Sequence, residues 1–122
     1  MQSGKELYPV GTNLYDGALF DKGYIDGKTG ELVEDDSYYA VSGYIQVSTA
    51  YEYTRSYRLY GVFNYDANHN FLGYQGGVNN LGTSVINAFI PGTKYIRTEV
   101  HIAYLAKDGT IGNKACRLIR TA

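Results

Sequence analysis

The stretch that decides the fold is Tyr95-Ile96-Arg97-Thr98-Glu99-Val100-His101-Ile102. Side chains of a β-strand point alternately to its two faces, so every second residue shares a face. One face then carries Ile96, Val100 and Ile102 with Thr98 among them, and the opposite face carries Tyr95, Arg97, Glu99 and His101. Burying the Ile/Val face stabilises a fold by about 1.5–3 kcal/mol per side chain. The stretch therefore predicts a strand with one core face and one polar face.

Similar short runs, rich in Tyr, Val, Ile, Thr and Phe, recur along the chain between Gly, Asn and Asp, which predicts an all-β sandwich or barrel. The expected strands are Tyr38–Val47, Tyr51–Arg58, Leu59–Tyr65, Phe71–Gln75, Ser84–Ile90, Lys94–Leu105 and Ala115–Arg120. Residues 66–70 and 107–110 are expected to be turns, and Gly73, Gly76 and Gly77 mark a bulge or a strand end. The first third lacks this pattern, and we expect it to wrap loosely around the sandwich.

The length of 122 residues suits one domain with its own core. We expect residues 13–122 to form a single β-sandwich and residues 1–12 to be an N-terminal extension, for which native sequence, a linker and a tag are the alternatives. The net charge is −1, from 11 Lys and Arg against 12 Asp and Glu. This balance argues against nucleic acid as a partner, because such proteins neutralise phosphates with an excess of basic residues. No apolar run approaches the length of a membrane span, so a membrane partner is not expected either.

The sequence offers little support for an enzyme. His69 and His101 lie thirty-two residues apart without neighbouring thiols, which argues against a zinc site. Glu31, Glu34, Asp35 and Asp36 lie together in a polar stretch, and we interpret them as a solvated loop. No nucleophile motif of recognisable spacing is present. The prediction is a non-catalytic protein.

Two short motifs imitate ligand-binding loops. Gly27-Lys28-Thr29 resembles the end of a phosphate-binding loop, but Lys22 stands where that loop needs a glycine, so a turn is predicted. Asp66-x-Asn68-x-Asn70 resembles the start of a calcium loop without its later glycine and glutamate. No cofactor is expected, although scattered Asp and Asn side chains leave a loop-borne structural calcium open. The lone Cys116 lies in an apolar run and is expected to be a buried, inert thiol.

The polar face of the first stretch has the composition of a saccharide platform. Tyr rings can stack on sugar rings, while Arg, Glu and His exchange hydrogen bonds with hydroxyls. Tyr51, Tyr53, Arg55 and Tyr57 share one face of another expected strand in the same way. The alternative is that these groups only stabilise a solvated sheet through cross-strand pairs. The candidate ligand-binding residues are Tyr53, Arg55, Tyr57, Tyr95, Arg97, Glu99 and His101.

Several motifs, taken in order, carry a family resemblance. They are Asn13-Leu14, Gly23-Tyr24-Ile25-Asp26, Thr29-Gly30, Ser42-Gly43-Tyr44-Ile45-Gln46-Val47, Tyr53-Thr54, Tyr65-Asp66-Ala67-Asn68, Phe71-Leu72-Gly73 and Phe89-Ile90-Pro91-Gly92-Thr93-Lys94-Tyr95-Ile96-Arg97. With this spacing, residues 13–105 resemble the carbohydrate-binding-module-like jelly-roll domains of tail, baseplate and tail-fibre proteins of phages that infect Gram-positive bacteria. The chain departs from the family at Gly43-Tyr44-Ile45-Gln46, where the family often has Asp-Tyr-Ile-Pro, and after Tyr104.

The resemblance implies a β-sandwich of jelly-roll type that acts as a binding module. Its location would be extracellular, on the virion, in a phage tail adhesion device that recognises host cell-wall polysaccharide. Its partners would be a saccharide of the host wall and the parent tail protein or neighbouring virion subunits. The alternative is a structural decoration or oligomerisation domain of a phage tail protein that binds no sugar, since Tyr and Arg are also enriched at protein interfaces.

Overall fold

The computed structural model describes residues 9–57, 59–78, 82–86 and 88–122. These residues form ten β-strands and one short 3₁₀ helix, η1. Their bounds are β1 Phe20–Ile25, β2 Leu32–Glu34, β3 Tyr39–Ser42, β4 Ile45–Gln46, β5 Tyr53–Ser56, β6 Leu59–Tyr65, β7 Phe71–Val78, β8 Thr83–Val85, β9 Tyr95–His101, η1 Ile102–Tyr104 and β10 Arg117–Arg120.

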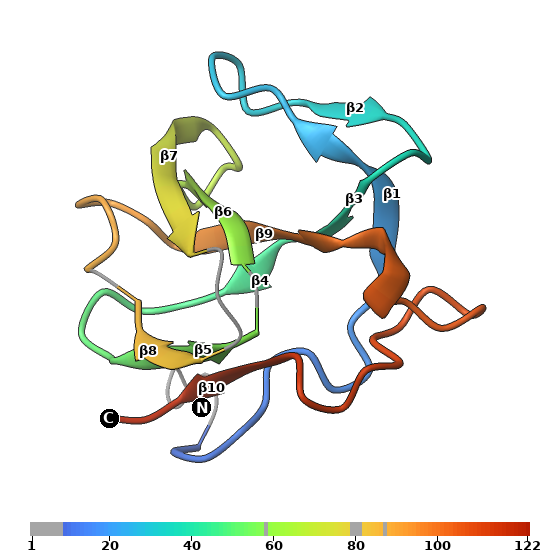
Figure 1. Cartoon of the computed structure of the whole chain (residues 1–122). Helices are drawn as coiled ribbons and strands as arrows, with labels where there is room; N and C mark the ends of the chain where they lie inside the picture. The colour runs from blue at the N-terminus through green and yellow to red at the C-terminus, as the bar shows by residue number, and fades with distance from the viewer. Residues whose placement is uncertain (1–8, 58, 79–81, 87) are drawn as a thin grey trace.

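The strands of this part of the chain form two antiparallel sheets. The large sheet has the order β2-β1-β3-β9-β6-β7, with β4 also paired to β9, and the small sheet has the order β10-β5-β8. In Figure 1 the large sheet curls. Strand β7, strand β2 and the part of β1 next to β2 lie on one side of β9, and the small sheet lies on the other side. The predicted all-β sandwich is confirmed.

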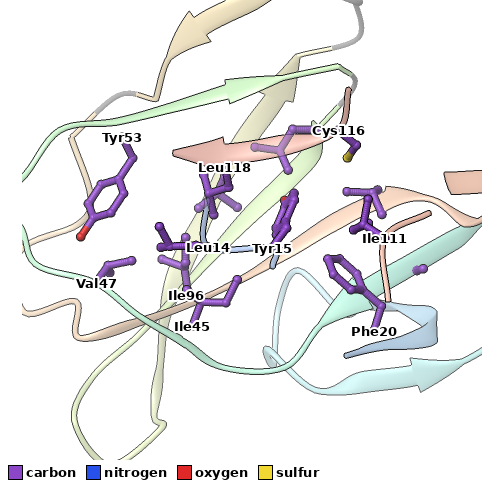
Figure 2. Packing of buried hydrophobic residues seen from close by; sticks show 14 of the residues in the cluster. Leu14, Tyr15, Phe20, Ile45, Val47, Tyr53, Ile96, Ile111, Cys116 and Leu118 are labelled. Carbon is purple, nitrogen blue, oxygen red and sulfur yellow. The ribbon is translucent and has the colours of Figure 1, made fainter. Parts of the chain in front are cut away.

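The main core fills the space between the two sheets. Ile96 and Val100 of β9 contact the apolar side chains of the small sheet and of the segment before β1. Figure 2 shows this packing, with Leu118 of β10 among Leu14, Tyr15 and Ile96. Thr98 lies on the same face, and its Oγ1 is 2.7 Å from the Tyr15 hydroxyl in a buried hydrogen bond. The predicted core face of β9 is thus confirmed for these residues.

The expected loose first third instead contains a hairpin, β1–β2. The first half of β1 pairs with β3, and from Gly23 onward β1 pairs with β2. Gly23 has φ +151°, and a Cβ there would lie 2.3 Å from the Val33 carbonyl oxygen. Glycine is therefore required where β1 exchanges one partner strand for another. The alternation of β1 is interrupted at this point, which explains why the sequence pattern did not indicate a strand.

The turn of this hairpin packs onto the outer face of the large sheet, the face turned away from the small sheet. The Tyr65 hydroxyl donates a 2.7 Å hydrogen bond to the Gly30 carbonyl, and Phe71 packs closely against Gly30. A second apolar cluster, the outer cluster, forms there from Ile25, Val41, Phe63 and Tyr65 with Leu32, Phe71 and Tyr95 at its margin. Both faces of the large sheet are therefore partly covered.

The remaining expectations for secondary structure are mostly confirmed. β6 has the expected bounds, and residues 66–70 form the predicted hairpin loop between β6 and β7. The predicted irregularity at Gly73 is a register shift opposite Asn64 and Tyr65. The expected strand Tyr38–Val47 is divided into β3 and β4, and the strand expected to end at Leu105 ends at His101, where η1 begins. Of the expected extension, residues 1–8 lie outside the described residues, while Gly11 and Thr12 already exchange backbone hydrogen bonds with Arg120.

Candidate functional site

The candidate site lies on the outer face of β9. The structure confirms that Tyr95, Arg97, Glu99 and His101 share this face, since their cross-strand partners include Phe63, Val41 and Tyr39 rather than core residues of the sandwich. The expectation that this face is open is wrong for its two central residues. Arg97 and Glu99 are each only 7% exposed, because the β1–β2 hairpin and the outer cluster cover them.

Glu99 is held by the backbone of the hairpin. Its Oε2 accepts a 2.9 Å hydrogen bond from the Ile25 amide, across 74 residues of sequence. Burial raises the pKa of the Glu99 carboxyl above its usual value, and the hydrogen bond from Ile25 opposes part of that increase. Among the described residues, no basic side chain forms an ion pair with Glu99. A buried carboxylate without a counter-charge is costly, and such groups gather at functional sites.

Glu99 opens into a groove of about 270 Å³ between the hairpin and the sheet. This groove, which we call the tyrosine groove, is lined by Tyr24, Ile25, Gly27, Tyr39, Phe63, Tyr74 and Glu99. Tyr24 and Tyr74 are 36% and 50% exposed, so their rings are accessible from solvent. The groove therefore combines tyrosine rings in its walls with one carboxylate.

A glycine at the position opposite Glu99 makes room for two of these rings. Gly61 of β6 pairs directly with Glu99, and a Cβ at Gly61 would lie 2.8 Å from Tyr74 and 2.9 Å from Phe63. The two rings lie 4.9 Å apart at 40° to each other. A larger residue at this position would displace both rings.

Arg97 belongs to a neighbouring group, the Arg97 cluster, which comprises Tyr44, His69, Tyr95 and Arg97. The guanidinium donates from Nε to the Ser42 carbonyl at 2.9 Å and lies 4.9 Å from the centre of the Tyr44 ring. Nη2 is 3.7 Å from the exposed Asp21 carboxylate. The Tyr44 and His69 rings stack at 3.8 Å, and Tyr95 meets His69 edge-on. Arg97 thus has several partners and does not neutralise Glu99.

His101 lies at the far end of the same face. Its Nδ1 accepts a 3.0 Å hydrogen bond from the Ala103 amide, so the ring caps η1. The ring also lies 4.6 Å from that of Tyr38, which is exposed. His101 is half-buried and does not line the tyrosine groove.

The second expected platform, on β5, is corrected by the structure. Tyr53 is 2% exposed and points into the main core (Figure 2), where its hydroxyl accepts a hydrogen bond from the Ser48 amide. Arg55 is also 2% exposed, and it donates to the carbonyls of Tyr57 and Gly82 and to the Ser84 hydroxyl. Alternation correctly grouped these residues, but their shared face is turned toward the sandwich interior.

Tyr57 lies one residue beyond the end of β5, in a left-handed conformation with φ 65°. Its half-buried ring meets Tyr104 edge-on at 5.7 Å and packs against the main core. Tyr53, Arg55 and Tyr57 therefore support the fold and do not line the tyrosine groove.

The other motifs have local structural roles. Asp66 accepts hydrogen bonds from the amides of Asn68 and Asn70, which closes the β6–β7 turn. Within the described ranges, no three His, Cys, Asp or Glu side chains come together as a metal-binding group. Lys28 lies in the turn of the β1–β2 hairpin, as predicted. Cys116 is buried as predicted, and burial raises its thiol pKa to about 12.

Sequence reasoning missed most of the residues that line the groove. Tyr24, Ile25 and Gly27 lie in the segment that lacked a strand pattern, and they reach the site only because the hairpin folds back. Phe63 and Tyr74 belong to strands that were predicted. A register for β6 against β9 would have placed Phe63 and the small residue Gly61 on the face of Glu99, but alternation alone does not supply a register.

Comparison with known proteins adds no assignment. The chain matches no family model, no curated protein and no solved structure. For the part of the chain that the structure describes, no helix has the length and apolar character needed to cross a membrane.

Proposed function

We propose that this protein is a non-catalytic carbohydrate-binding module and that the tyrosine groove is its ligand site. The observation that carries the proposal is the combination of accessible Tyr24 and Tyr74 rings with the buried Glu99 carboxylate in one groove. Tyrosine rings offer flat apolar surface to the C–H face of a sugar ring. An ionised carboxylate accepts hydrogen bonds from hydroxyls, and these bonds are stronger than those that a neutral acceptor forms.

The proposed context is a phage tail adhesion device that attaches to polysaccharide of the Gram-positive cell wall. This part of the proposal rests on the resemblance of residues 13–105 to phage tail domains. The formal net charge of −1 is compatible with a ligand recognised by stacking and hydrogen bonds rather than by neutralisation of many phosphates. Weak single sites suffice in such a device, because many copies on one particle bind together.

The experiment is retention of the fluorescently labelled protein on purified cell walls from a panel of Gram-positive bacteria, with soluble saccharides as competitors. We expect retention that one type of saccharide abolishes. Replacing Tyr74, a wall of the groove, by serine should reduce retention at least tenfold. The control is Tyr51→Ser, because Tyr51 lies beside Arg120 on the small sheet, away from the groove.

Two results would contradict the proposal. If the folded, monodisperse protein is retained on no wall in the panel, the structural role in a tail becomes the better hypothesis. If the Tyr74→Ser and Tyr51→Ser variants are retained equally, the protein binds walls through another surface.

A further inference from the structure

Glu99 is the one charged residue among the described residues that line the tyrosine groove. It is 7% exposed, and its Oε2 accepts the hydrogen bond from the Ile25 amide. Within the part of the chain that the structure describes, Oε1 of Glu99 has no partner at hydrogen-bond distance. A hydrogen-bond donor or a cation in the groove would therefore meet an acceptor that the protein itself leaves available.

The described residues do not supply the missing positive charge. Arg97, the other charged residue in the centre of this face, is directed to the Ser42 carbonyl, the Asp21 carboxylate and the Tyr44 ring. Removing a carboxylate from water without a counter-ion costs free energy that an incoming cation recovers. The electrostatic character of the groove therefore favours a positively charged ligand.

The rings around Glu99 favour the same class of ligand. Tyr24, Tyr39, Phe63 and Tyr74 line the groove together with the carboxylate. The face of an aromatic ring is negative and attracts a cation that lies over it, most strongly where water is displaced. Several rings with one carboxylate form the arrangement that binds substituted ammonium groups.

The size of the groove limits what it can enclose. Its volume of about 270 Å³ lies just below the range of about 300–1,000 Å³ that is usual for pockets enclosing a whole drug-sized ligand. A single substituted ammonium group fits this description better than an oligosaccharide does. The remainder of a polymeric ligand would lie outside, across the exposed Tyr74 and Tyr24 rings.

We propose that the tyrosine groove binds an ammonium group carried by the ligand, with Glu99 as its counter-ion and the surrounding rings as cation–π partners. The inference rests on the proposed function in so far as it places that ammonium group on the wall polysaccharide. The ligand class is thus a saccharide polymer that bears an amine or a quaternary ammonium.

The probe is choline chloride, titrated into isotopically labelled protein and followed by backbone amide NMR. Its uncharged carbon isostere, 3,3-dimethylbutan-1-ol, has the same shape without the charge. We expect choline to shift the Ile25 and Glu99 amides and to bind at least tenfold more tightly than the isostere. Equal binding of the two compounds would overturn the inference, because the groove would then be recognising shape and apolar surface alone.

Two variants test whether choline binding depends on the Glu99 carboxylate itself or only on the net charge of the protein. Glu99→Gln should weaken choline binding at least tenfold, whereas Glu34→Gln, on the exposed strand β2, should leave it unchanged. Tyr74→Leu keeps an apolar side chain without an aromatic face, and it should weaken choline binding severalfold in a protein with an unchanged spectrum. Choline affinity unaffected by both Glu99→Gln and Tyr74→Leu would refute the site.

The same variants separate this inference from the proposed function. If Glu99→Gln keeps full, saccharide-competed retention on walls and wild type does not bind choline, the ammonium inference is wrong and the saccharide function stands. If choline binds through Glu99 but no wall retains the protein, the ammonium site stands and the wall-binding proposal fails.

Discussion

Replacement of Gly30 by alanine is expected to detach the β1–β2 hairpin from the outer face of the large sheet. Gly30 has φ +74°, and a Cβ at this position would lie 2.3 Å from Cγ of Phe71 and 2.5 Å from its Cβ. An L-residue in the left-handed region costs about 1–2 kcal/mol, and forcing an extra carbon into a packed contact costs about 1–3 kcal/mol.

The hairpin can relieve the clash only by moving away from Phe71. That movement breaks the Tyr65 hydroxyl bond to the Gly30 carbonyl, which contributes about 0.5–1.5 kcal/mol. We therefore expect the free energy of unfolding to fall by about 2–4 kcal/mol, since relaxation recovers part of the summed strain. At a denaturant slope of about 2 kcal/mol per M, the urea midpoint would fall by about 1–2 M.

The assay is urea unfolding followed by circular dichroism, with Gly27→Ala as the matched control. Gly27 lies in the same turn and does not have a positive φ, and a Cβ at this position would meet no heavy atom within 4 Å. We expect its stability to change by less than about 0.5 kcal/mol. Hydrogen exchange at the Ile25 amide, which is bonded to Glu99, should accelerate only in Gly30→Ala. Equal midpoints for the two variants would refute the docked position of the hairpin.

Three further outcomes are expected from the described contacts. Arg55→Ala should lower the thermal midpoint, because it removes hydrogen bonds that a buried guanidinium donates to Tyr57, Gly82 and Ser84, and a hydrogen bond to a charged group contributes about 1.5–3 kcal/mol. The folded variant should keep its retention on walls, and lost retention at full stability would contradict the structural role of Arg55. Burial raises the pKa of the Cys116 thiol to about 12, so at pH 8 the native protein should not react with Ellman's reagent, whereas the unfolded protein should. Rapid labelling of the native protein would contradict the burial of Cys116. Choline affinity, measured by NMR from pH 7 to pH 4, should fall as Glu99 becomes protonated. Because burial raises the pKa of Glu99, this fall should begin at a pH above the usual carboxyl pKa of 4.5. Protonation also removes the cost of burying the charge, so Glu99 lowers the free energy of unfolding most at pH values above its folded pKa. The charged and titratable groups that face Glu99 are Arg97 and the tyrosines Tyr24, Tyr39, Tyr65 and Tyr74.

Local patterns were sufficient for much of the fold. Alternation in residues 95–102 correctly separated Ile96 and Val100 from Arg97 and Glu99, because a strand imposes a period of two whatever surrounds it. The turns at 66–70 and 107–110 were also predictable, since Asp66 and Asp108 close them by accepting hydrogen bonds from backbone amides within the same few residues.

The same patterns did not indicate which face meets a core. Tyr53 and Arg55 looked like a ligand platform, yet their face is turned into the sandwich, where backbone carbonyls satisfy the guanidinium. A polar composition indicates a solvent-exposed face only when no residue distant in sequence supplies hydrogen-bond partners for its polar side chains. The carbonyl of Gly82 is such a partner, and it is 27 residues away along the chain.

The sequence by itself determined the strand class, the turns, and the grouping of Tyr95, Arg97, Glu99 and His101 on one face, because these depend on residues that are neighbours along the chain. Only the tertiary structure decided that Glu99 is buried and that tyrosine rings surround it. The groove exists because β1 changes partner at Gly23, the hairpin folds back until Gly30 meets Phe71, and Ile25 reaches Glu99. Each of these contacts joins residues far apart in sequence, so a local pattern carries no information about them.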